Sequence, residues 1–170
     1  MQRTIKIKQC FPYPVEQVWK ALTDPMLLGK WFMENNLQPA LGHEFTFRMA
    51  PQKGWDGITY CKIVELQPME KIAYTYCGTA TGEKALACAN IHSGKADAIG
   101  KGIFTTLDTK LKFTLSTTCG GTCLAMEHSG YKGLKLVIVS LVMGMGWKKQ
   151  LRKRLPLVLE QISREETQVK

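Results

Sequence analysis

The sequence predicts an α+β fold in which an antiparallel sheet is covered by a long C-terminal helix. Three observations indicate it: a strand-like N-terminus followed by a helix-like segment, alternating apolar and polar residues between residues 43 and 129, and a return to helical periodicity near the C-terminus. The chain has 170 residues, enough for one domain with a substantial core, and we expect a single domain over residues 1–170.

The first 32 residues predict one strand and two helices. Residues 3–10 alternate apolar and charged side chains, which is typical of a strand. Pro14 suits the first turn of a helix that Pro25 should end near Asp24. The apolar stripe of this helix contains Val15, Val18, Trp19 and Leu22. Residues 26–32 predict a second, short helix.

Five further segments have the period of strands: 43–49, 57–66, 71–77, 109–117 and 122–129. Gly120 and Gly121 are expected to form a two-residue hairpin turn, because such turns require positive φ. In that register Cys119 lies opposite Thr122, so Cys119 and Cys123 point to opposite faces and share neither a disulfide nor a metal.

The C-terminal part predicts an amphipathic helix that begins at Gly146. Its stripe recurs every three or four residues: Trp147, Leu151, Leu155, Val158 and Ile162. Pro156 lies within this pattern, so we expect a kink or a new helix start there.

The apolar stretch before this helix raises the question of a membrane anchor. Residues 136–147 are uncharged, whereas a bilayer core needs about 20 apolar residues. We therefore expect an interior wall without a membrane span, in a soluble, monomeric protein that does not partition into membranes and is not found in carbonate-washed membranes. Five basic residues follow this stretch: Lys148, Lys149, Arg152, Lys153 and Arg154. No aromatic residues interleave with them, so we expect them to form a solvated helix face that binds no nucleic acid.

The cysteine pattern and the N-terminal sequence together predict the cellular compartment. The N-terminus has no continuous apolar region of the kind found in secretory signals, and the six cysteines include no CxxC pair. We therefore expect six free thiols and a cytoplasmic location.

Few residues suggest catalysis. Residues 93–102 resemble a phosphate loop but have the wrong glycine spacing and no Ser or Thr after the lysine. The three histidines lack metal-site spacing, so no metal or cofactor is expected. His128 shares a strand face with Leu124 and Met126, where it is either a polar group inside a pocket or a hydrogen-bonded core residue. It is a weak candidate for a catalytic acid or base, and the sequence leaves enzymatic activity uncertain.

Several motifs, in order, resemble one family. Residues 18–25, with Leu28 and Trp31 after them, Gly42 before "EFTF", "KIVELQPMEKIAYTY", "GGTCLAMEHSGY" and Gly146-Trp147 are similar to the activator-of-heat-shock-protein-90-ATPase homologue-like domains of the START-like (SRPBCC, birch-pollen-allergen-like) superfamily. The resemblance spans about residues 5–160. It departs at His43, where the family usually has a second glycine, and in the longer, glycine-rich stretch 78–108.

The resemblance implies a helix-grip fold, a curved antiparallel sheet around a long C-terminal helix, with a cavity between them. A small apolar or amphipathic molecule is the expected ligand. The expected wall residues are Phe47, Tyr60, Tyr74, Tyr76, Met126, His128, Met143 and Trp147, with Trp31 and Trp55 near the mouth. Two alternatives stay open: a stress-response or chaperone-regulating protein that acts through its basic surface, and a cyclase- or hydrolase-type enzyme that uses His128.

Overall fold

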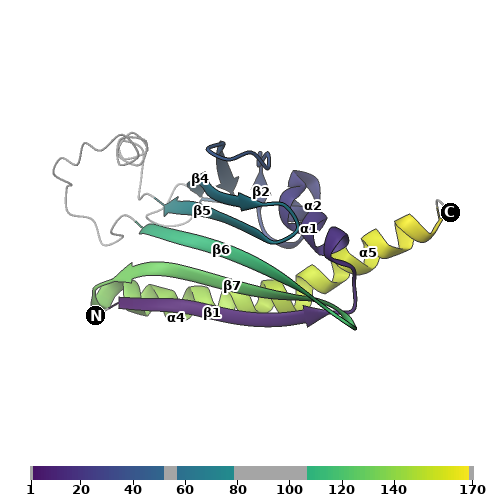
Figure 1. Ribbon diagram of the computed structural model, residues 1–170. Helices are drawn as coiled ribbons and strands as arrows, with labels where there is room; N and C mark the ends of the chain where they lie inside the picture. The colour runs from purple at the N-terminus through teal and green to yellow at the C-terminus, as the bar shows by residue number, and fades with distance from the viewer. Residues whose placement is uncertain (1, 52–56, 79–106, 169–170) are drawn as a thin grey trace.

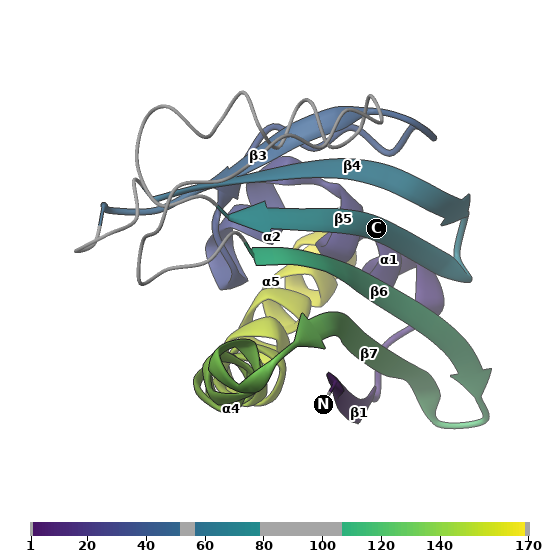
Figure 2. The ribbon, with the colours of Figure 1, turned by 90° about the vertical axis from the view of Figure 1, so that its left-hand side faces the viewer.

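The structure is a computed structural model that describes residues 2–51, 57–78 and 107–168. One antiparallel sheet curves around a long C-terminal helix, which lies on its concave face (Figures 1 and 2). The predicted α+β architecture is therefore confirmed.

Within the described residues, the sheet has seven strands in the order β1-β7-β6-β5-β4-β3-β2. Their bounds are β1 Gln2–Phe11, β2 Glu34–Asn35, β3 Glu44–Arg48, β4 Ile58–Gln67, β5 Lys71–Gly78, β6 Leu107–Thr118 and β7 Gly121–Lys132. Each predicted strand is present, and the two-residue strand β2 was not predicted. The first strand pairs with the last, which places the N-terminal segment beside the strand that leads into the long helix.

Two short helices follow β1, as the proline pattern predicts. Helix α1 (Val15–Thr23) begins after Pro14, and α2 (Pro25–Trp31) begins at Pro25. Asp24 ends the first helix and caps the second, because its carboxylate accepts hydrogen bonds from the backbone N–H groups of Met26 (2.9 Å) and Leu27 (3.0 Å).

The C-terminal helix begins earlier than expected, at Leu134 instead of Gly146. It consists of α4 (Leu134–Lys149), a π-helical turn η2 (Gln150–Arg154) and α5 (Leu155–Gln168). The wide turn ends two positions before Pro156, which has no N–H to donate and whose ring would crowd the carbonyl one turn earlier in a regular α-helix. The irregularity expected at this proline is therefore a π turn followed by a new α-helical segment.

The core lies between the helix and the sheet. The predicted stripe is buried throughout, with Trp147, Leu151, Leu155, Val158 and Ile162 all facing inward. Along β7, Leu124, Met126 and His128 are fully buried, as the strand alternation predicts.

The hairpin between β6 and β7 differs from the expected register. Thr118 pairs with Gly121, so the two-residue loop is Cys119-Gly120, and Thr117 faces Thr122. Gly121 (φ 138°) packs against the end of β1, where a Cβ would lie 2.1 Å from the carbonyl oxygen of Phe11. The second glycine therefore serves close packing against β1 and is not part of the loop.

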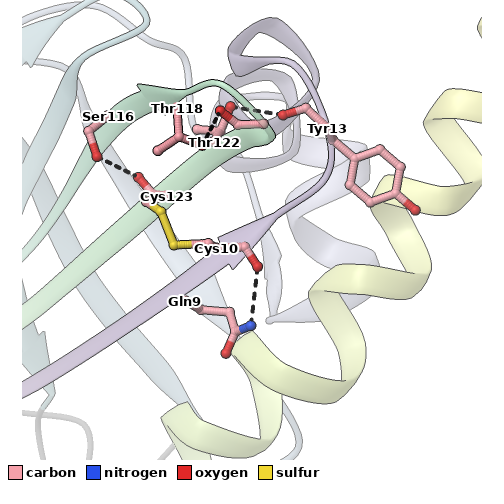
Figure 3. Close-up of a disulfide and its surroundings, with 8 residues drawn as sticks. Gln9, Cys10, Tyr13, Ser116, Thr118, Thr122 and Cys123 are labelled. Atoms are coloured by element: carbon pink, nitrogen blue, oxygen red, sulfur yellow. Dashed lines mark hydrogen bonds between the residues drawn. A yellow bond between two sulfur atoms is a disulfide. The ribbon is translucent and has the colours of Figure 1, made fainter.

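The prediction of six free thiols is wrong. Cys10 and Cys123 lie directly opposite each other on β1 and β7 and form a disulfide (Figure 3). Cys77 is also disulfide-bonded, Cys61 and Cys119 are free, and Cys88 lies outside the described residues. Disulfides are typical of oxidising compartments, so the cysteines give no support to a cytoplasmic location, which stays a prediction.

The expectation of an interior wall holds for only part of α4. Ser140 and Trp147 are buried, whereas five apolar side chains are exposed: Leu134 (67%), Ile138 (56%), Leu141 (48%), Val142 (63%) and Met145 (65%). The sequence did not distinguish the two faces, because this segment is apolar on both. Within the described residues, no helix is long and apolar enough to cross a membrane.

Candidate functional site

His128 is the centre of a buried hydrogen-bond network beneath the long helix. Its Nε2 lies 2.8 Å from the hydroxyl of Thr109 on β6. That hydroxyl donates its one hydrogen to the backbone carbonyl of Tyr76 (2.9 Å). The Thr109 oxygen must therefore accept from His128, which places the imidazole proton on Nε2.

The contacts of the other ring nitrogen, Nδ1, indicate the same protonation state. The indole Nε1–H of Trp147, which can only donate, points at Nδ1 of His128 from 3.1 Å. Nδ1 therefore carries a lone pair, and the imidazole is neutral. Burial lowers the pKa of His128 to about 3, in agreement with this assignment.

Tyr131 completes the network from the end of β7. Its hydroxyl lies 2.9 Å from Nδ1 of His128 and 3.2 Å from the sulfur of Met143 on α4. Strict alternation along β7 would place Tyr131 on the face opposite His128. The pairing with β1 shifts between Arg3 and Ile5, where three steps on β7 match two on β1. This β-bulge, with Gly130 at φ 106°, returns Tyr131 to the inner face.

Aromatic rings surround this polar network. Phe47, Tyr74 and Phe113 are buried in the sheet, and the ring of Tyr76 lies 5.1 Å from that of His128. From the other side, Phe32 stacks on Trp147 with ring centroids 4.5 Å apart. The site is therefore a set of packed aromatic rings, the aromatic enclosure, around an uncharged hydrogen-bond network of His128, Thr109, Tyr131 and Trp147.

The structure brings most of the predicted residues together. Phe47, Tyr74, Tyr76, Met126 and Trp147 belong to one buried core, and Met143 packs against it. His128 is fully buried and contacts the rings of Tyr76 and Trp147 in this core. Tyr60 does not join them. It pairs with Cys77 on the outer face of the sheet, whereas its neighbour Thr59 is buried. β4 carries apolar residues on both faces near this point, so its alternation was ambiguous.

The structure describes only one of the two tryptophans expected near the mouth of the cavity. Trp31 is fully buried, and its indole donates to the carbonyl of Ala21 (2.9 Å), so it is a core residue of the α1–α2 unit. Trp55 lies outside the described residues. Sequence analysis missed Phe32, Thr109 and Tyr131, of which Thr109 had a signal: it belongs to the same strand face as Leu111 and Phe113.

The comparison with known proteins agrees with this architecture. Residues 12–160 match the family described as "Activator of Hsp90 ATPase homolog 1-like protein". The chain belongs to this family. No curated protein is significantly similar to the chain.

Solved structures show the same fold as this Hsp90-ATPase-activator-like domain. A protein of Mesorhizobium loti is 28% identical, with a TM-score of 0.72 over 94% of this chain and 98% of its own. A Bacillus halodurans protein is 23% identical (TM-score 0.66, 94% of this chain and 99% of its own). CalU16 of Micromonospora echinospora is 24% identical (TM-score 0.62, 99% of this chain and 85% of its own). Together with the family match, the Mesorhizobium loti structure supports a START-like ligand-binding domain in general, and the other two show the fold.

Proposed function

We propose that this domain binds a small apolar or amphipathic molecule between the concave face of the sheet and the C-terminal helix. The observation that supports it is the aromatic enclosure around an uncharged hydrogen-bond network centred on His128. Binding sites for small apolar ligands have this composition, with many hydrophobic and aromatic side chains and a few placed polar groups. Such a site favours an uncharged molecule, because His128 is neutral.

The hydrogen bonds favour binding over acid–base catalysis. The Nε2–H of His128 is directed to Thr109, and the Nδ1 lone pair faces the donor of Trp147. A pKa of about 3 leaves no proton on Nδ1 to donate near neutral pH. For His128 to act as a base, Trp147 would first have to move away.

The test uses saturable binding of the uncharged fluorescent probe N-phenyl-1-naphthylamine, together with native mass spectrometry of protein from its own host. Tyr76→Leu alters the proposed wall, and Tyr60→Leu makes the same change on the outer face of the same sheet. We expect Tyr76→Leu to change the Kd at least about 10-fold and Tyr60→Leu to leave it within about 2-fold.

Thermal unfolding of both variants separates loss of the site from loss of the fold. An absence of saturable probe binding, or equal effects of the two substitutions, would reject the proposal. A chaperone-regulating interaction would then explain the family membership better, and it is testable by measuring Hsp90 ATPase activity with and without the protein.

A further inference from the structure

The exposed apolar residues of α4 form one continuous row. Leu134, Ile138, Leu141, Val142 and Met145 are spaced at intervals of four, three, one and three, which places them on a single helix face. We call this row the α4 stripe. The opposite face of α4 carries Ser140, Met143 and Trp147 toward the protein, so the stripe points outward.

The stripe is long and accessible at the margin of the molecule. Helix α4 has 16 residues, which corresponds to about 24 Å of helix. In Figures 1 and 2 it runs beside β1 and β7, at the opposite side of the sheet from β3. A planar surface could therefore meet its whole length.

The segment of the chain that contains the stripe carries only positive charges. Between residues 128 and 159 the chain has no acidic residue and seven basic ones: Lys132, Lys135, Lys148, Lys149, Arg152, Lys153 and Arg154. Lys135 lies at the first turn of α4, and Lys148 and Lys149 lie at its last, so cations flank the stripe at both ends. All three are exposed.

We propose that the α4 stripe is a docking surface for an anionic lipid membrane, on which the protein lies peripherally. An apolar helix face flanked by lysines can enter the boundary between headgroups and acyl chains, while the long lysine side chains reach the lipid phosphates. This surface is separate from the enclosure around His128, so the inference does not depend on the proposed ligand.

The charge argues against the main alternative, a second copy of the chain. A twofold contact through α4 would bring two segments of seven basic residues together, with no acidic residue in either segment to compensate. An anionic membrane compensates these charges and requires no shape-matched groove. Peripheral binding of this kind departs from the sequence-based expectation that the protein does not partition into membranes, because the sequence does not reveal the exposed face of α4.

The test is co-sedimentation of the full chain with vesicles of phosphatidylcholine, with or without about 30% phosphatidylserine. Leu134→Gln/Met145→Gln alters the stripe. Leu41→Gln/Met26→Gln is the matched control, since these side chains are as exposed (69% and 76%) but lie between β2 and β3 and on α2. Lys148→Gln/Lys149→Gln tests the charge.

We expect binding to the phosphatidylserine vesicles that weakens in high salt. It should fall at least about 10-fold in the stripe variant and about 20-fold in the lysine variant, and stay within about 2-fold in the control. The inference is overturned if phosphatidylserine does not increase binding, which is the result expected if the stripe binds a protein partner. It is also overturned if the control falls as far as the stripe variant, or if light scattering shows a dimer that the stripe variant dissociates.

Discussion

At the scale of single residues, three side chains in the described part of the chain contact the ring nitrogens of His128. Thr109 accepts from Nε2, while Trp147 and Tyr131 face Nδ1. Protonation of Nδ1 would place a hydrogen against the N–H of Trp147 and a charge in an apolar core. Both effects disfavour the imidazolium. The same groups that hold the ring in place therefore keep it neutral.

This neutrality makes stability depend on pH. The unfolded chain binds a proton on His128 below about pH 6.5, whereas the folded pKa is about 3, so the folded state loses stability as pH falls from 6.5 toward 3. We expect this residue alone to lower the unfolding free energy by about 2 kcal/mol between pH 7.5 and pH 5.

Urea unfolding at the two pH values measures this effect. His128→Gln should lose that part of the pH dependence, whereas His43→Gln, which changes a histidine outside the core, should retain it. An unchanged pH dependence in His128→Gln would show that His128 is already protonated in the folded state or that it titrates alike in both states.

At the scale of elements, the bulge in β7 decides which side chains meet. Gly130 has φ 106°, and a Cβ there would lie 3.0 Å from the carbonyl oxygen of Asp108 and 3.0 Å from Cα of Thr109. Only a residue without a side chain fits between the strands in this conformation. The bulge then directs Tyr131 inward, where it contacts both His128 and Met143.

Gly130→Ala should therefore destabilise the protein by about 1–3 kcal/mol, through backbone strain and the contact with β6. Gly120→Ala, in the hairpin loop, is the control: a Cβ there meets nothing within 4 Å, and a change of less than about 0.5 kcal/mol is expected. Urea unfolding of both variants measures the difference. Equal stabilities would mean that the bulge relaxes to accept a side chain.

These elements also show what the sequence could and could not predict. Period-2 alternation correctly placed Phe47, Tyr76 and His128 inside, because their strands are regular there. It missed Tyr131, because one inserted residue reverses the alternation without a marked change in composition. It also missed the exposed stripe of α4, since a helix that is apolar all round does not indicate which face the protein covers.

At the scale of the whole molecule, the closing contact joins the first strand to the last. β1 and β7 pair over nearly their full lengths, and the Cys10–Cys123 disulfide links positions 113 residues apart. Local patterns could not reveal this link, because it depends on which distant strands become neighbours and in what register. It encloses most of the domain within one covalent loop.

This loop should make the bridge important for stability. Cross-linking residues so far apart restricts the unfolded chain strongly, and loss of such a bridge typically costs about 2–5 kcal/mol. A reductant would not isolate the effect, because Cys77 is also disulfide-bonded. The appropriate variant is therefore Cys10→Ser/Cys123→Ser, unfolded in urea without reductant. Cys119→Ser, which removes an exposed free thiol from the adjacent loop, should change stability by less than about 0.5 kcal/mol. If the double variant is as stable as this control, the disulfide does not contribute to stability, and the pairing of β1 with β7 is sufficient without it.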